Sequence, residues 1–370
     1  MSKHIANTKI LMIMTSKFQR SGITAVVVNV LKELFKYEDV AIDLVVPNGS
    51  DEQLMSETRK LGAKVFEMSG KSRIFITPLY IYRLSRIIRK GKYDVVHIHG
   101  SSTLLYLELL AAKIGGVEKR IVHSHNTATS HRIAHRILRK KFDRAYTSAV
   151  ACSEDAGRWL FGNKDFTTIQ NGIEIDKYLY NSHKRKEIRD KYSIEEDDIV
   201  VGHVGLFNQQ KNQEYLVDVL EKALTDCKNI KLLLIGKGET EKSIKENVRE
   251  KGLGCNVIFA GEVYDVGSYY SAMDVFVMPS RFEGFGLAAL EAQISGLPCI
   301  LSDKIPDETI VSNKVCRLGI KEENVPEWAD MIKKETRRTR GIKRELFNKY
   351  DIRNTAKEYL AIYRERDDEN

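Results

Sequence analysis

Two glutamates flank a glycine turn in the second half of the chain. Glu283 stands directly before residues 284–286, whose sequence is Gly-Phe-Gly, and Glu291 lies eight positions after Glu283. Carboxylates accept hydrogen bonds from hydroxyl groups, so the pair suits a ligand with hydroxyl-bearing groups on both sides of the turn. The alternative is that Glu283 only caps a helix and Glu291 only faces solvent, because motifs this short also arise by chance.

The residues around this pair predict an anion site. The run 275–278 has the β-branched and aromatic content of a buried strand, and a helix-forming run begins at Leu287. Gly284 and Gly286 have no Cβ, so backbone N–H groups can approach a ligand at the positive end of the helix. We therefore expect a phosphate group at this turn.

Two pairs of histidines follow strand candidates in the first half of the chain. His97 and His99 end one such run, and His123 and His125 end the next. Ligands of open α/β sheets bind at the carboxyl ends of strands, so both pairs are expected to point toward one crevice. A zinc site is an alternative, but it lacks a matching acidic or thiol ligand nearby. We expect His125 to line the ligand site and the other three histidines to support the structure.

Length and composition indicate a globular protein of two domains. The 370 residues, 42% hydrophobic and 30% charged, are enough for two separate cores. No run has the length of a membrane helix, and residues 1–9 are not followed by an apolar stretch of signal-peptide length, so we expect a cytoplasmic protein. The five cysteines are odd in number and lack C-x-x-C spacing, which indicates neither a disulfide framework nor a zinc site.

Positive charge is concentrated in the first half of the chain. Residues 1–180 hold 28 Lys and Arg against 17 Asp and Glu, whereas residues 181–370 hold 31 against 34. Two basic amphipathic segments, 79–90 and 132–144, contribute to this excess. A solvated helix face is the default for either segment, but two of them in one half predict docking to an anionic membrane surface. No nucleic-acid-binding pattern accompanies the charge, so we expect no nucleic acid as partner.

Short apolar runs alternate with helical patterns along the whole chain. This alternation predicts an α/β fold whose parallel sheets are covered by helices on both faces. The strand candidates are 9–14, 42–46, 64–68, 95–98, 121–124, 149–152, 199–204, 231–235, 257–261, 275–278 and 299–303.

The Glu283-x7-Glu291 motif, followed by Ser-Gly-Leu-Pro at 295–298, resembles the signature of glycosyltransferase family 4. These are retaining enzymes of the two-domain GT-B fold that use nucleotide-sugar donors. The resemblance covers nearly the whole chain and implies two Rossmann-like domains facing each other across a cleft. The implied domains are an acceptor-side domain (1–180), a nucleotide-sugar-binding domain (181–345) and a C-terminal helix (346–370) that crosses back to the first domain.

The resemblance also implies roles for single residues. Glu283 would contact the donor sugar, His125 would lie beside the donor sugar and the acceptor, and Lys211 would pair with the donor diphosphate; these three are the expected catalytic residues. Glu291 would bind the ribose, and the backbone at Val263 would contact uracil. The expected donor-binding positions are Gly22, Gly205, Lys211, Gly236, Val263, Glu283, Gly284, Phe285, Gly286, Leu287 and Glu291.

One position departs from the family pattern. Leu206 stands where the family has an arginine, and the loss of a guanidinium removes a bidentate phosphate contact. Lys17, Arg20 or Lys237 are candidates to supply the charge instead. The chain contains no Asp-x-Asp, so there is no candidate for a metal-bound diphosphate, and protein cations and helix N-termini are expected to stabilise it.

The resemblance therefore implies a retaining, metal-independent glycosyltransferase with no cofactor other than its nucleotide-sugar substrate, expected to be a UDP-sugar. The acceptor would be a glycan or a lipid-linked glycan of polysaccharide biosynthesis, and the enzyme would bind peripherally to the inner face of the cell membrane. Two alternatives stay open. One is a non-catalytic partner subunit that binds a nucleotide-sugar, and the other is a sugar-nucleotide epimerase on the same fold.

Overall fold

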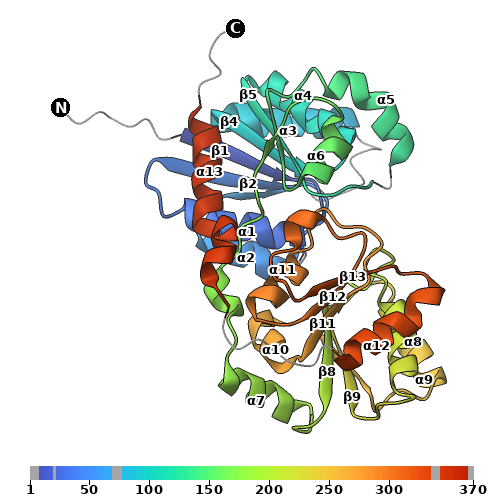
Figure 1. Cartoon of the computed structure of the whole chain (residues 1–370). Coiled ribbons are helices and arrows are strands. Elements are labelled where there is room, and N and C mark those ends of the chain that lie inside the picture. The colour runs from blue at the N-terminus through green and yellow to red at the C-terminus, as the bar shows by residue number, and fades with distance from the viewer. Residues whose placement is uncertain (1–7, 20–21, 69–76, 130, 335–341, 366–370) are drawn as a thin grey trace. The chain divides into compact units, whose positions relative to one another are not determined.

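The computed structural model describes residues 8–19, 22–68, 77–129, 131–334 and 342–365. The chain divides into two compact units (Figure 1). Unit 1 comprises Met1–Ile173 and Lys349–Asn370, and unit 2 comprises Glu174–Asn348. The expected boundaries were 180/181 and 345/346.

Unit 1 is built on a seven-stranded parallel sheet of order β3-β2-β1-β4-β5-β6-β7. Its strands are β1 (Thr8–Met14), β2 (Val40–Val46), β3 (Val65–Glu67), β4 (Val95–Gly100), β5 (Lys119–Ser124), β6 (Ser148–Ala151) and β7 (Thr167–Thr168). Its helices are α1 (Gly22–Leu34), α2 (Glu52–Lys60), α3 (Thr77–Gly91), α4 (Tyr106–Gly115), α5 (Arg132–Phe142), α6 (Glu154–Phe161) and α13 (Ile352–Arg364).

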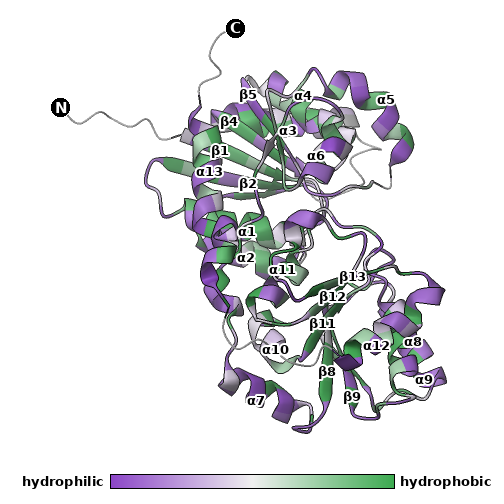
Figure 2. Ribbon diagram, viewed as in Figure 1, coloured by the Kyte–Doolittle hydropathy of each residue, from purple (hydrophilic) through white to green (hydrophobic). Residues whose placement is uncertain are grey.

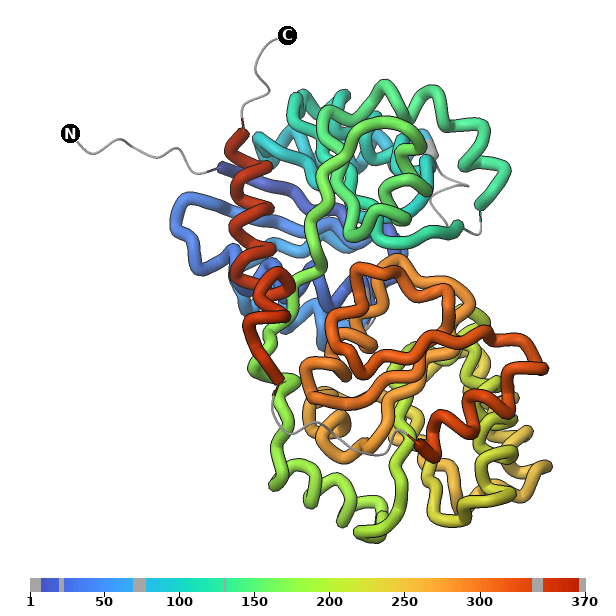
Figure 3. Tube along the Cα trace, viewed as in Figure 1, coloured from blue at the N-terminus to red at the C-terminus, as the bar shows by residue number. Residues whose placement is uncertain are grey.

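The C-terminal helix α13 packs in unit 1, beside α1 (red and blue in Figure 3). The chain leaves and re-enters this unit at one point, because the N–H of Ile173 donates to the carbonyl of Tyr350 (2.8 Å) and the N–H of Ile352 donates to the carbonyl of Ile173 (3.1 Å). The side chain of Asp351 caps α13 by accepting from the N–H of Arg353.

Unit 2 is built on a six-stranded parallel sheet of order β10-β9-β8-β11-β12-β13. Its strands are β8 (Ile199–Val204), β9 (Ile230–Ile235), β10 (Val257–Gly261), β11 (Val275–Met278), β12 (Cys299–Ser302) and β13 (Val315–Leu318). Its helices are α7 (Ser182–Lys191), α8 (Gln213–Ala223), α9 (Glu241–Glu250), α10 (Val266–Ala272), α11 (Leu287–Ile294) and α12 (Val325–Lys334). Short 3₁₀ turns occur at Thr103–Leu105, Ile175–Tyr178, Asp307–Thr309, Glu322–Asn324 and Arg344–Tyr350.

Both faces of the second sheet are covered, which explains its continuous apolar strands. Along β9, Leu232 and Leu234 join a core with α8, α9 and α12, whereas Leu233 and Ile235 join a second core with α10 and α11. Figure 2 shows the hydrophobic strands of both sheets between more polar helices. The alternation of apolar and helical runs had predicted this parallel α/β arrangement, and the prediction is confirmed.

The two basic amphipathic segments form α3 and α5, as expected. Within the residues that the structure describes, no helix is both long enough and apolar enough to cross a lipid bilayer.

Candidate active site

The loop between β11 and α11 places a carboxylate beside the open N-terminus of a helix. Gly286 precedes α11 with a left-handed backbone (φ 91°, ψ 51°), and no side chain caps the helix. The first N–H groups of a helix have no acceptor in a preceding turn and carry partial positive charge. Thr309 donates a hydrogen bond to the carbonyl of Phe285, and Ser302 donates to the carbonyl of Ser280 (2.6 Å), so both ends of the loop are held. The loop is thus held in place beside a helix N-terminus without a side-chain cap, which is the geometry that the expected anion site requires.

Glu283 in this loop forms a buried ion pair with Lys211. The Lys211 Nζ lies 2.7 Å from the Glu283 Oε1, and the two side chains are 17% and 8% exposed. Lys211 follows β8 and is held there because its N–H donates to the side-chain oxygen of Asn208 (3.0 Å). The structure therefore brings together two of the three expected catalytic residues, although 72 positions separate them in the sequence.

Glu291 lies on α11, where two tyrosines contact it. The hydroxyl of Tyr270 donates to the Glu291 Oε2 (2.9 Å) and also to the carbonyl of Ala288 (3.0 Å). Burial raises the pKa of Glu291 to about 7, against the opposing hydrogen bonds from Tyr270 and Tyr178 and the charge of Lys211. This carboxyl group thus changes charge near neutral pH. The sequence analysis did not identify either tyrosine, since nothing local to them indicates a contact with α11.

The glycines after β8 and β9 have a packing role that the sequence analysis did not foresee. Gly236 has φ 133°, and a Cβ on it would lie 2.0 Å from the carbonyl oxygen of Gly205. A Cβ on Gly238 would lie 2.2 Å from the carbonyl oxygen of Phe207. Any side chain here would push the two loops apart, so the close crossing of the loops already requires glycine. Whether they also face a donor stays a prediction.

The remaining expected donor positions lie at strand and helix ends. Val263 follows β10 and packs against the second core of unit 2. Gly22 is the first residue of α1 in unit 1, whereas Ser21 and Arg20 lie outside the described residues.

A guanidinium that the sequence analysis missed lies in the same loop as Glu283. Arg281 donates from its side chain to the Asn212 Oδ1 (2.9 Å) and from its N–H to the carbonyl of Gln210 (2.8 Å). Both acceptors adjoin Lys211 in the chain. Leu206, where the family arginine was expected, is half-buried, and its carbonyl accepts from the Gln213 side chain (2.8 Å).

The four histidines in and directly after β4 and β5 form one buried stack in unit 1. They alternate along the strands with residues of the opposite face, and His99 pairs in register with His123. The His99 Nδ1 lies 2.9 Å from the His125 Nε2, and the ring centroids of His123 and His125 are 4.2 Å apart. Burial lowers the pKa of His97 and of His125 to about 3, so these rings are neutral at pH 7. The two pairs lie together, and His125 is the most exposed of the four at 5%, but the expectation that they face a ligand crevice stays a prediction.

Comparisons with known proteins identify the family to which the chain belongs. The glycosyltransferase family 4 model matches residues 20–177, and the model of the group 1 glycosyl transferases matches residues 184–350. EpsF of Bacillus subtilis (strain 168), a protein named as a glycosyltransferase, is 31% identical over 337 residues, which cover 86% of this chain and 85% of EpsF. The capsular polysaccharide biosynthesis glycosyltransferase CapH of Staphylococcus aureus is 25% identical and covers 94% of this chain and 96% of its own.

Solved structures show the same fold. Anabaena Alr3699/HepE, crystallised with UDP and glucose, superposes with a TM-score of 0.79 at 18% identity and covers 96% of this chain and 98% of its own. A mutant of TarM from Staphylococcus aureus, crystallised with fondaparinux, α-GlcNAc-glycerol and UDP, gives a TM-score of 0.73 at 14% identity and covers 97% of this chain and 100% of its own.

Two parallel α/β units of this kind define a protein of the GT-B class, which confirms the predicted fold class. The chain belongs to glycosyltransferase family 4 and is a glycosyltransferase.

Proposed function

We propose that this glycosyltransferase moves a sugar from a UDP-sugar to a glycan or lipid-linked acceptor in the synthesis of a cell-surface polysaccharide, with retention of anomeric configuration. The observation that carries the proposal is the Lys211–Glu283 pair beside the uncapped N-terminus of α11. A relative from Escherichia coli, 27% identical over 62% of this chain and 63% of its own, is named a UDP-Gal:α-D-GlcNAc-diphosphoundecaprenol α-1,3-galactosyltransferase. Its name supports both the UDP donor and the lipid-linked acceptor.

On the donor side, the diphosphate occupies the N-terminus of α11. Helix N-termini bind such anions through their free N–H groups and their partial positive charge. In the free protein Lys211 neutralises Glu283. When the donor binds, sugar hydroxyls replace the ammonium on Glu283, and Lys211 is released to the diphosphate. The ion pair therefore compensates both buried charges until the donor binds.

The leaving diphosphate gains negative charge as the bond to the sugar breaks. Lys211, the guanidinium of Arg281 and the first turn of α11 supply positive charge without a metal ion at the diphosphate. Preorganised donors of this kind, aimed at developing charge, contribute about 2.7–4 kcal/mol each to transition-state stabilisation. In this proposal Arg281 takes over the charge that Leu206 cannot supply.

Glu291 binds the ribose hydroxyls of the donor, and the backbone at Val263 contacts the uracil. A carboxylate accepts two hydroxyl hydrogen bonds only when it is ionised. Because Glu291 has a pKa of about 7, its ionised fraction rises with pH through neutrality. On the acceptor side, the proposal assigns His125 of unit 1 to the reacting sugar.

Helix α5 is the part of unit 1 that the proposal places on a membrane surface. Ile133 and Ile137, one helical turn apart, are 79% and 71% exposed. The exposed cations on and after the helix are Arg132, Arg136, Lys140, Lys141 and Arg144. Apolar side chains surrounded by cations suit the headgroup region of an anionic bilayer. We propose that the enzyme meets its lipid-linked acceptor at this membrane surface.

The donor can be identified by a thermal-shift screen of nucleotide-sugars, with Glu283→Gln as the matched variant. A ligand at 100 times its Kd should stabilise the wild-type protein by about 2.7 kcal/mol. We expect UDP-sugars to raise the Tm more than free UDP does, and the excess to disappear in Glu283→Gln. Equal shifts for every nucleotide in both proteins would contradict the assignment of Glu283 to the sugar.

The product then separates the proposal from its alternatives. We expect an NMR spectrum of the purified glycoside to show the anomeric configuration of the donor, and addition of Mg²⁺ or Mn²⁺ to leave the rate unchanged. An epimerase would convert the donor without an acceptor, and a non-catalytic partner would bind it without turnover. Either result would contradict the proposed reaction.

A further inference from the structure

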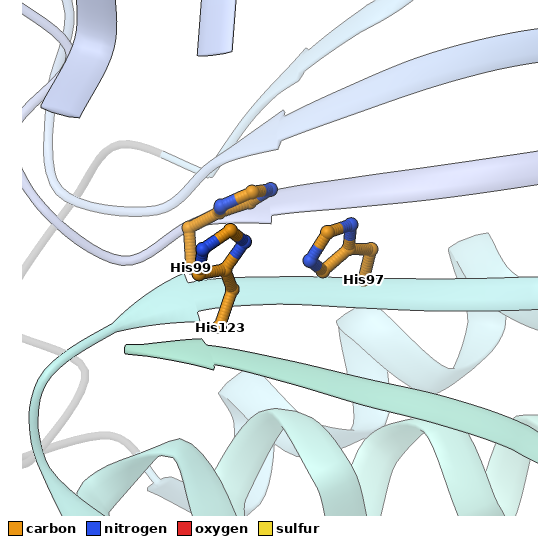
Figure 4. A group of neighbouring side chains, drawn as sticks. All are labelled: His97, His99 and His123. Atoms are coloured by element: carbon orange, nitrogen blue, oxygen red, sulfur yellow. The ribbon is translucent and has the colours of Figure 1, made fainter. Parts of the chain in front are cut away.

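The histidine stack of unit 1 contains ring nitrogens that nothing in the fold satisfies. His97, His99 and His123 come from two adjacent strands, and one ring nitrogen of each lies within 4.8 Å of those of the other two (Figure 4). All three side chains are buried. The Nε2 atom of each is inaccessible to solvent and has no hydrogen-bond partner within the described part of the chain. Each of the three rings therefore has one nitrogen in the common cluster and one nitrogen without a partner, which indicates a missing ligand.

The other nitrogen of each ring has a partner. The His97 Nδ1 lies 2.8 Å from the hydroxyl of Tyr363, the His123 Nδ1 lies 3.1 Å from the hydroxyl of Tyr359, and the His99 Nδ1 lies 2.9 Å from the His125 Nε2. Each Nδ1–H can therefore donate a hydrogen bond while Nε2 keeps its lone pair. Histidines that bind metals in proteins are oriented in this way, by a hydrogen bond from the second ring nitrogen.

We propose that His97, His99 and His123 bind a divalent metal ion of the zinc class, through one ring nitrogen each. Imidazole is a ligand that suits Zn²⁺, Cu²⁺ and Ni²⁺, and three protein ligands leave a fourth position for water. Because the three atoms are at most 4.8 Å apart, there is a point no more than about 2.8 Å from each of them. Zn–N bonds are about 2.0–2.1 Å long, so each nitrogen would have to move toward that point by less than about 1 Å.

The protonation state of the rings favours this assignment. Burial, followed by the neighbouring rings, lowers the pKa of His99 and of His123 well below the usual value, and burial lowers that of His97 to about 3. Imidazole must be neutral to bind a metal, and these rings hold no proton that the ion would have to displace at pH 7. A buried water molecule would also satisfy the orphaned nitrogens, and the experiment below separates the two cases.

The ion would join β4, β5 and α13. Tyr359 and Tyr363 belong to α13, which starts at Ile352, more than 220 positions after β5 ends at Ser124. A metal that fixes the rings also fixes the acceptors of their Nδ1–H groups, so it would tie the C-terminal helix to the sheet. The ligands belong to unit 1, whereas the metal-free diphosphate site proposed above concerns residues of unit 2. The structural role expected for these histidines would then be to hold α13 on the sheet through the metal ion.

The test uses the full-length, tag-free protein, because an engineered histidine tag would itself bind metal. After treatment with a chelator and dialysis, the protein is titrated with Co²⁺ and then Zn²⁺. We expect one Co²⁺ per chain, with visible absorption of a low-coordinate site with nitrogen ligands, displacement of Co²⁺ by one Zn²⁺, and a rise in Tm on metal addition. No Co²⁺ absorption at saturation would overturn the proposal and leave water as the occupant.

Three variants locate the site. His99→Ala should abolish the Co²⁺ absorption, and Tyr363→Phe should weaken binding by about 10–100-fold, the usual effect of removing the partner of a metal-bound histidine. The matched control is His203→Ala. His203 in unit 2 is also buried, with its Nδ1 bonded to the carbonyl of Val277 (2.9 Å) and its Nε2 unpaired within the described residues, but it belongs to no cluster of metal-binding groups in the described part of the chain. Equal loss in His203→Ala and His99→Ala would contradict the site. If His99→Ala does not fold, the wild-type titration and Tyr363→Phe still decide.

Discussion

The Lys211–Glu283 pair yields a prediction about stability whose size follows from its burial. The charged atoms are 2.7 Å apart, and Glu283 is only 8% exposed. Removing one partner of a fully buried ion pair costs about 3–5 kcal/mol, because the remaining charge is left without compensation. Lys211 keeps some contact with solvent, so we expect Lys211→Met to lower the free energy of unfolding of unit 2 by about 2–3 kcal/mol.

Tryptophan fluorescence makes this measurement specific to one unit. The chain has two tryptophans, Trp159 in unit 1 and the fully buried Trp328 in unit 2. In a Trp159→Phe background, urea unfolding followed by Trp328 reports unit 2 alone. The control is Lys245→Met, which removes a more exposed pair with Glu241 on α9 and should change stability by no more than about 0.5 kcal/mol.

The same variants test catalysis. Glu283→Gln keeps the shape of the side chain but removes its charge, and both Glu283→Gln and Lys211→Met should lower kcat by about 10²-fold or more, the scale for losing one electrostatic contact in a transition state. The double variant should be destabilised by less than the sum of the single variants. If Lys211→Met were no less stable than Lys245→Met and retained full turnover, the reasoning about this pair would be refuted.

Three further predictions concern other parts of the site. The folded-state pKa of Glu291 is raised to about 7, so its protonation stabilises the fold fully below about pH 4.5. In chemical denaturation, the wild type should lose this stabilisation, at most about 3 kcal/mol relative to Glu291→Gln, as the pH rises through 7. UDP binding measured by calorimetry should tighten over the same pH range in the wild type only. Leu206→Arg should leave kcat/KM within about 3-fold if Arg281 already supplies the guanidinium, and a gain of about 10-fold or more would show that it does not. The double change Ile133→Ser and Ile137→Ser should weaken binding to anionic liposomes, and wild-type binding should fall steeply between 0.1 M and 1 M salt as the Debye length shrinks from about 10 Å to about 3 Å; binding that ignores both changes would exclude α5 as the docking surface.

The fold was predictable from the sequence because its signals are local. Continuous apolar runs such as 231–235 and 275–278 mark strands buried on both faces, and their alternation with helices requires parallel sheets. Two strands were not among the candidates. β7 (Thr167–Thr168) has only two residues, and β13 (Val315–Leu318) is partly buried and contains an arginine, so neither has the composition of a central strand.

The residues of the candidate site were identifiable, but their contacts were not. The Glu-x7-Glu motif named Glu283 and Glu291, yet the partners Lys211 and Tyr270 come from other elements 72 and 21 positions away. Contacts between residues so far apart in the sequence depend on the packing of the whole unit, so no local sequence pattern predicts them. Gly236 shows a different limit, because loop packing already requires glycine at a position interpreted as facing a ligand, and the ligand role itself stays a prediction.

The tyrosines of α13 show the same limit. Tyr359 and Tyr363 occupy the apolar face of a C-terminal helix, where spacing alone predicts core packing. Their hydroxyl groups instead lie at hydrogen-bonding distance from histidines that precede them by more than 200 positions. Hydrophobic periodicity identifies which face of a helix is buried, but it does not reveal which polar groups that face will meet.

Acceptor-dependent release of UDP tests the central claim most directly. Wild-type protein and Glu283→Gln are incubated with the UDP-sugar found in the screen, with and without a diphosphate-linked lipid acceptor, and free UDP and glycoside are measured together. We predict that wild-type protein releases UDP in proportion to glycoside only when acceptor is present, and that Glu283→Gln does so at least about 10²-fold more slowly. UDP binding without transfer in the wild type, or undiminished transfer in Glu283→Gln, would contradict the proposed donor site.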